Sequence, residues 1–186
     1  DRRHGAPRVA RRRAGVAGPA RGRPPLPPVG LAPALSDSDP GRASAVGRRE
    51  GADPTRPALV LHGHLDVVPA QAEDWSVDPF AGEEIDGLLW GRGAVDMKDM
   101  DAMILAVVRQ MVREGRKPAR DVVVAFFADE EAGGAYGARY AVDHRPELFE
   151  GATEAISEVG GVSGEVGGRR AYLRESAGAG GAGLRG

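Results

Sequence analysis

The stretch ALVLHGHLDVV, residues 58–68, decides the fold class of this chain of 186 residues. Its first half is apolar and β-branched, which is typical of a strand that is covered on both faces. A second run of this kind, DVVVAFFA, occupies residues 121–128. Between the two runs, apolar residues recur at helical spacing from Met97 to Val112, and Gly115 comes next as a natural helix terminator. The pattern predicts a strand, an amphipathic helix and a second strand.

Three further elements complete the expected fold. Residues 134–144 are typical of a helix, and residues 152–158 of a third strand. The alternation of strands and helices predicts an α/β fold with a mainly parallel sheet flanked by helices. Before the long helix, residues 83–93 predict a small inserted hairpin, because Asp86 and Gly87 form a turn signal.

Residues 1–50 differ sharply in composition from residues 51–161. They hold 11 of the 25 Lys+Arg residues, all of them arginine, with four acids and no aromatic side chain. Such a segment buries too little apolar surface to offset its ordering entropy, so we expect it to be disordered. A basic nucleic-acid-binding arm, a transit peptide and translation in a wrong frame or from a wrong start would each explain it. The lack of lysine and the abrupt change at Gly51 favour a misframed segment.

The overall composition excludes several classes of protein. A formal net charge of -2 argues against a general attraction to nucleic acid or to an anionic membrane. Without cysteine there is no thiolate zinc site, so any metal must be held by histidine and carboxylates. No apolar run approaches the roughly 20 residues needed to cross a bilayer, and the basic stretch lacks the apolar core of a secretory signal. We therefore expect a soluble, cytoplasmic protein.

Polar side chains stand where the first predicted strand ends. In the motif HGHLD, His64 is a candidate zinc ligand, and Asp66 can receive its other ring N–H and fix the tautomer. A hydrogen-bonded or solvated pair without metal is the alternative for these two residues. His62 lies further back in the strand, where we expect a structural role.

Further carboxylates come after the next elements. Asp96 directly precedes the long helix, so it is either a metal ligand or the N-cap of that helix. Asp129, Glu130 and Glu131 end the second strand, where they form either a metal site or a solvated acidic cluster at a helix N-terminus. Glu158 ends the third strand.

The carboxyl ends of parallel strands meet at one edge of a sheet, where ligands bind in open α/β folds. We therefore expect His64, Asp96, Glu131 and Glu158 to converge on one crevice. A set of nitrogen and oxygen ligands suits zinc, with cobalt or manganese as possible substitutes.

Four linked motifs, GHLDVVP, DWSVDPF, DGLLWGRGAVDMKDM and ADEEAGGAYGA, occur in this order between residues 51 and 161. In order and spacing they resemble the zinc metallopeptidase and amidohydrolase family of acetylornithine deacetylase, succinyl-diaminopimelate desuccinylase, aminoacylase and the glutamate carboxypeptidases. The resemblance implies a zinc exopeptidase-like catalytic domain. It also implies a hydrolase that cleaves amide bonds of dipeptides or N-acyl amino acids with zinc-activated water.

The resemblance further implies a role for each site residue. His64 and Glu158 would bind one zinc ion, Glu131 the second, and Asp96 would bridge the two. Asp66 would orient His64, and Glu130 would be the general base that takes the water proton. The assignment between the adjacent glutamates comes from the family pattern alone.

The chain also departs from the family. Members of the family are expected to be about twice as long and to contain a second histidine ligand and a lid and dimerisation domain. In this sequence the only histidine after His64 is His144. Residues 51–165 would be a partial catalytic domain, and residues 166–186 the start of the lid or an irregular tail. Full-length relatives would be homodimers that act on a small molecule or dipeptide, without nucleic acid or membrane.

Three hypotheses remain for this chain. It is an active zinc-dependent amidohydrolase, a truncated and inactive metal-binding remnant of one, or a non-catalytic interaction module with a basic arm. The motifs argue against the third hypothesis, and the missing histidine favours the second over the first.

Overall fold

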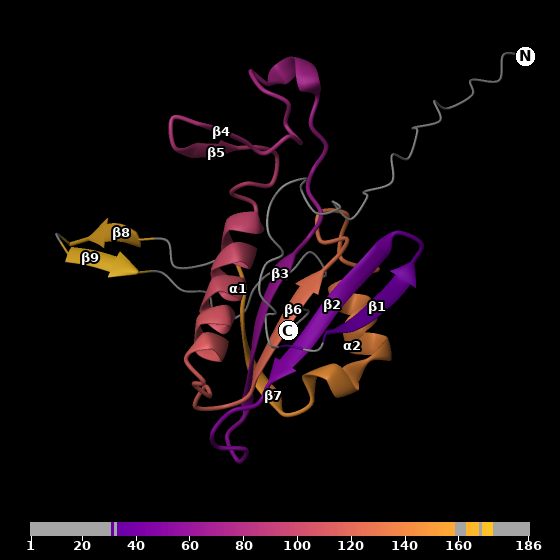
Figure 1. Cartoon of the computed structure of the whole chain (residues 1–186), viewed down its shortest axis with the longest axis vertical. Coiled ribbons are helices and arrows are strands. Elements are labelled where there is room, and N and C mark those ends of the chain that lie inside the picture. The colour runs from indigo at the N-terminus through magenta and orange to yellow at the C-terminus, as the bar shows by residue number, and fades with distance from the viewer. Residues whose placement is uncertain (1–30, 32, 159–162, 168, 173–186) are drawn as a thin grey trace, which may run out of the picture.

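A computed structural model describes residues 31, 33–158, 163–167 and 169–172. Its centre is a five-stranded sheet (Figure 1). In spatial order the strands are β1 (Ala34–Asp39), β2 (Arg42–Arg49), β6 (Val122–Phe127), β3 (Ala58–His64) and β7 (Ala152–Ile156). Strands β3, β6 and β7 run parallel, while β2 is antiparallel to both of its neighbours. The predicted α/β fold with a mainly parallel core is confirmed.

Helices cover both faces of the sheet (Figure 1). On one face lies α1 (Lys98–Arg113), and Gly115 comes after it with a φ of 62°, as expected for a helix terminator. The other face carries α2 (Ala138–His144) and the short 3-10 helix η2 (Pro146–Phe149). The predicted helix at residues 134–144 begins late because the preceding glycines adopt left-handed backbone conformations that a helix does not accommodate.

Three smaller elements lie outside the main sheet. The predicted hairpin is present as β4 (Glu83–Ile85) and β5 (Leu88–Trp90), and both residues of its turn, Asp86 and Gly87, have positive φ. A short 3-10 helix η1 (Ala72–Asp74) precedes it. A second hairpin consists of β8 (Ser163–Val166) and β9 (Arg169–Tyr172).

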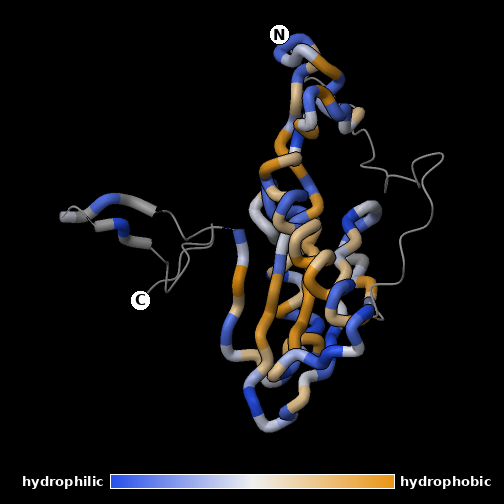
Figure 2. The backbone as a smooth tube through the Cα atoms, turned by 60° about the vertical axis from the view of Figure 1, so that its left-hand side comes forward, coloured by the Kyte–Doolittle hydropathy of each residue, from blue (hydrophilic) through white to orange (hydrophobic). Residues whose placement is uncertain are grey.

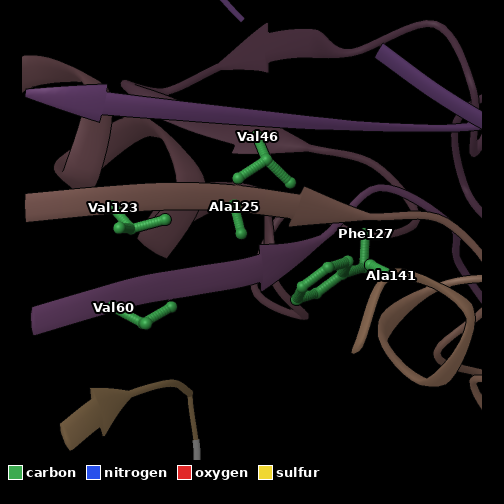
Figure 3. Close-up of a cluster of buried hydrophobic side chains, with 6 residues drawn as sticks. All are labelled: Val46, Val60, Val123, Ala125, Phe127 and Ala141. Atoms are coloured by element: carbon green, nitrogen blue, oxygen red, sulfur yellow. The ribbon is translucent and has the colours of Figure 1, made fainter. Parts of the chain in front are cut away.

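Strand β6 divides the hydrophobic core into two layers, because alternate side chains of a strand point to opposite faces. Val123, Ala125 and Phe127 pack toward α2, together with Val46, Val60 and Ala141 (Figure 3). Val122 and Val124 pack toward α1, against Ile104 and Val108. The hydropathy colouring accordingly places long hydrophobic stretches in the central strands (Figure 2). This two-sided burial holds the carboxyl ends of β3 and β6 in place.

The prediction of disorder across residues 1–50 is wrong for the part that forms β1 and β2. These strands make a hairpin whose second strand pairs with β6 from Ala45 to Arg49. The composition did not indicate this hairpin because it has few large apolar residues of its own. It packs on the apolar residues of β6, and its buried side chains Ser36, Ser44 and Val46 are small or medium in size. The sheet thus begins before the expected boundary at Gly51. Residues 1–30 lie outside the described part of the chain, as do residues 173–186.

Among the helices that the structure describes, none combines the length and the apolar character needed to cross a membrane.

Candidate metal centre

The ring of His64 is the centre of the site. It lies at the carboxyl end of β3, is almost fully buried, and its backbone N–H is 3.2 Å from the Sδ atom of Met97. Its Nδ1 atom lies 3.0 Å from the backbone oxygen of Asp66. A carbonyl oxygen only accepts hydrogen bonds, so Nδ1 carries the hydrogen. The Nε2 atom therefore faces the opposite side, where it either carries a second proton or offers a lone pair.

Three carboxylates surround that Nε2 atom. Asp96 Oδ1 lies 3.0 Å away, Glu158 Oε1 3.5 Å and Glu130 Oε2 3.8 Å. They come from the segment before α1, the end of β7 and the loop after β6, which are distant in sequence. The predicted convergence at one edge of the sheet is therefore present in the fold.

The donor atoms fall into two groups that both contain His64. One group is His64, Glu130 and Glu158, and the other is His64, Asp96 and Glu131, with the donor atoms of each group within 4.8 Å of one another. Every residue expected from the sequence to be a metal ligand thus belongs to at least one group. Glu130, expected as the base, also lies within ligand distance, so the distances alone do not divide the roles of Glu130 and Glu131.

Asp66 connects the two sides of the site. Its Oδ1 and Oδ2 atoms accept the backbone N–H groups of Glu130 and Glu131, each at 3.0 Å. Its Oδ1 also lies 3.5 Å from His64 Nδ1, further than the backbone oxygen of the same residue. The acceptor nearest to the ring N–H of His64 is therefore the backbone oxygen of Asp66 rather than the expected carboxylate, which mainly holds the backbone of the acidic loop.

The N-cap alternative for Asp96 is wrong. Helix α1 begins after Met97, which occupies the N-cap position without a side-chain capping bond, and the carboxylate of Asp96 turns toward His64 instead. The backbone N–H of Lys98 is satisfied by the oxygen of Gly93. This loop closure frees the Asp96 side chain to face the site.

The acidic loop after β6 is fixed from behind by Asp129. This residue has a φ of 76° and is buried, and its Oδ2 atom accepts the backbone N–H of Tyr136 at 3.0 Å. Its carboxylate also forms an ion pair with Arg42 at the start of β2. Asp129 therefore turns away from the site, while the next two residues face it.

The crowded charges change the proton affinities of the site. Burial alone would lower the pKa of His64, but the hydrogen bonds to the Asp66 backbone and the Asp96 side chain and the charges of Glu158 and Asp66 raise it overall. Burial, and then the neighbouring carboxylates Asp96 and Glu130, raise the pKa of Glu158 above its ordinary value, although His64 opposes this. The neighbouring carboxylates thus contribute to both shifts, beside burial at Glu158 and the backbone hydrogen bond at His64.

The donor set fits a divalent cation. One oriented imidazole nitrogen and several carboxylate oxygens are the ligands that zinc, cobalt and manganese accept in proteins. A cation would remove the mutual repulsion of the carboxylates around Nε2.

The other histidines of the described residues take no part in the two donor groups. His62 packs its ring 5.8 Å from that of Phe127, and burial lowers its pKa, in agreement with the expected structural role. His144 at the end of α2 stacks on the ring of Tyr140 at 4.4 Å. The second histidine ligand that the resemblance implies is thus not supplied by His144.

Two residues near the site were missed from the sequence. Arg42 gave no signal, because its pairing with Asp129 depends entirely on the hairpin position. Asp101 did give one: it lies on the apolar stripe of α1 with Ile104 and Val108, in line with the N-cap residue Met97, and is buried with them. An acid on the apolar face of an amphipathic helix is uncommon enough to single out.

Comparison with known proteins gives a consistent result. Residues 60–170 match the model of peptidase family M20/M25/M40. Aminoacylase-1 of Sus scrofa is 41% identical over 110 residues, which are 59% of this chain and 27% of the relative. Succinyl-diaminopimelate desuccinylase of Delftia acidovorans is 36% identical over 122 residues, 63% of this chain and 32% of the relative.

A solved structure supports the same assignment. The crystal structure of human carnosine dipeptidase 1 matches with a TM-score of 0.59 and 26% identity, covering 69% of this chain and 29% of that one. The chain therefore spans between a quarter and a third of the length of these relatives.

Proposed function

This chain belongs to peptidase family M20/M25/M40, and on that basis we propose that it carries metal-binding residues of a hydrolase of dipeptides or N-acyl amino acids. The main support for the proposal is that carboxylates from three separate segments surround the Nε2 atom of His64. Without a cation, this arrangement requires a charged histidine to offset several acids. With one, each donor gains a partner of opposite charge.

Six residues have roles in the proposed centre. His64, Asp96, Glu131 and Glu158 would hold two zinc ions, with Asp96 shared between them. Asp66 would keep Nδ1 of His64 protonated and hold the acidic loop through the backbone N–H groups of Glu130 and Glu131. Cobalt and manganese, which accept the same ligands, are possible substitutes.

A bound divalent cation supplies Lewis-acid chemistry, because it polarises an amide carbonyl and lowers the pKa of a water molecule. The remaining chemistry belongs to Glu130, whose side chain is exposed toward incoming solvent. Its carboxylate would take a proton from water as the water oxygen attacks the carbonyl carbon, and deliver it to the amine as the C–N bond breaks. The products are a carboxylate and an amine.

The experiment uses the chain stripped of metal with a chelator. Zinc, cobalt or manganese is added, and binding is followed by calorimetry and by the cobalt absorption spectrum. Release of amino acid from N-acetyl amino acids and dipeptides is followed in parallel. We expect Glu130→Gln to retain metal but lose turnover by at least about a hundredfold, as for other general bases. Glu84→Gln, which changes an exposed glutamate on β4, is the matched control.

The outcomes separate the hypotheses. Failure of all three cations to bind would overturn the proposed centre. Tight binding without turnover would contradict hydrolysis by this chain and support the inactive metal-binding remnant. Metal-dependent turnover that Glu130→Gln removes would exclude that remnant and the non-catalytic interaction module alike.

A further inference from the structure

Asp101 is a buried carboxylate close to the residue that precedes His64 of the candidate metal centre. It lies in the first half of α1 with 7% of its surface exposed. Among the described residues, its Oδ1 atom has no hydrogen-bond partner. A buried carboxylate normally accepts hydrogen bonds, because their loss leaves its desolvation uncompensated. Its presence on the apolar stripe of α1 therefore destabilises the fold unless another charge compensates.

The position of Asp101 is set by its contact with β3. A Cβ atom placed on Gly63 would overlap with Asp101 Oδ1 and would lie 2.8 Å from Met97 Cε. The helix therefore lies against the backbone of β3 at the residue before His64. The N-cap residue of α1, Met97, accepts the backbone N–H of His64 with its Sδ atom. Asp101 Oδ1 thus lies against the residue that directly precedes His64, a ligand of the candidate metal centre.

Positive charge near Asp101 is limited. Lys98 and His64 are the cationic groups that favour its charged form, and Asp99 opposes them. Lys98 donates its ammonium hydrogen to the backbone oxygen of Leu65 at 2.8 Å, and the imidazole of His64 faces the carboxylate cluster. Both cationic groups thus have other hydrogen-bond partners. Their interaction with Asp101 is electrostatic and acts through the low-dielectric interior.

We infer that Asp101 is a positioning residue for the metal centre, which it serves by adding a buried negative charge beside the residue that precedes His64. The inference rests on the proposed function, since it needs a cation at His64. A bound dication would compensate the buried carboxylate, and the carboxylate would in turn strengthen cation binding. The charge of Asp101 would then increase cation affinity, and the bound cation would offset the cost of burying this charge. In the metal-free protein the charge would only destabilise the fold.

The test compares Asp101→Asn with the unchanged chain. Asparagine keeps the size of the side chain and removes the charge. We expect zinc and cobalt affinity to fall about tenfold to a hundredfold, the usual effect of losing a group that supports the ligands. The urea midpoint of the metal-free variant, in contrast, should be equal or higher. Asp99→Asn, an equal change of charge at an exposed residue of the same helix turn, should alter the affinity by less than about threefold because solvent screens it.

Each result decides the matter. Equal affinity of Asp101→Asn and the unchanged chain would overturn the inference while leaving the proposed metal centre in place. Loss of metal-free stability together with affinity would identify a packing role and also overturn it. If the unchanged chain binds no divalent cation, the proposed function fails and the inference fails with it.

Discussion

Arg42, at the start of β2, forms an ion pair with Asp129, which is buried directly before the two glutamates of the metal centre. The same guanidinium lies 5.3 Å from the ring centre of Tyr136, whose backbone N–H donates to Asp129. The hydroxyl of Ser38, on β1, donates to the backbone oxygen of Tyr136. The β1–β2 hairpin is therefore attached to the loop that carries Glu130 and Glu131.

The first prediction concerns this ion pair. Replacing Arg42 by methionine leaves Asp129 buried without its cation, which should cost about 1–3 kcal/mol of unfolding free energy. Urea unfolding of the metal-free protein measures the loss. The double variant Arg42→Met with Asp129→Asn should recover part of it, because the asparagine still accepts the Tyr136 N–H without carrying a charge. Arg56→Met, at an exposed arginine, is the control, and an equal loss there would refute the role of the pair.

A second prediction concerns the contact between α1 and β3. In Gly63→Ala the new methyl group must displace Asp101 and Met97, which should cost about 1–3 kcal/mol. Because Met97 also binds the backbone N–H of His64, metal affinity should fall as well. Gly91→Ala, where the nearest atom lies at 3.4 Å, should leave both unchanged. Calorimetric zinc titration and urea unfolding provide the two readouts, and normal affinity in Gly63→Ala would show that the contact does not position His64.

The third prediction concerns Asp66. Its carboxylate accepts the N–H groups of both glutamates, so Asp66→Ala should cost about 1.5–3 kcal/mol for the loss of bonds to a charged group. The acidic loop should also become mobile, which hydrogen exchange of the amides of residues 129–131 would detect. Asp66→Asn retains one acceptor and should lose less. Unchanged exchange in Asp66→Ala would indicate that the loop is held by Asp129 alone.

A fourth prediction concerns pH. Burial raises the pKa of Asp101 from 3.8 to about 6, so the folded protein binds this proton more tightly than the unfolded chain. The resulting stabilisation is fully present below pH 3.8 and is lost as the pH rises through about 6. It amounts to about 1–3 kcal/mol. The unfolding free energy of the metal-free protein, measured with urea, should therefore fall between about pH 4 and about pH 7.5. The part of this fall that comes from Asp101 should be absent in Asp101→Asn. The raised pKa of His64 acts in the same direction and should persist in the variant.

Much of the site could be predicted because parallel strands bring their carboxyl ends together. HGHLD at the end of β3, the acids after β6 and Glu158 after β7 come at the ends of strands that hydrophobic runs make recognisable. The periodic helix α1 fixed the place of Asp96. The sequence did not decide whether Asp96 caps the helix or faces the site, since both roles suit an aspartate before a helix. The position of His64 at the end of β3, within 3.0 Å of the Asp96 carboxylate, decided between the two roles.

The hairpin at residues 34–49 shows where composition fails. Strands β1 and β2 carry serine, alanine and arginine, which by themselves suggest no core. They are ordered because β2 pairs with β6, whose apolar residues supply the surface that is buried. Such stabilisation is a property of the pair and is absent from either segment alone.

The sequence by itself determined the fold class, the family motifs and the donor atoms, because strand and helix periodicities and residue types are local properties. The tertiary structure alone decided how these atoms face one another. It placed three carboxylates around His64 Nε2, turned Asp129 toward Arg42, and set Asp101 behind Gly63. These relationships depend on side chains from distant segments meeting in a buried space, where the strength of each interaction depends on burial and neighbouring charge.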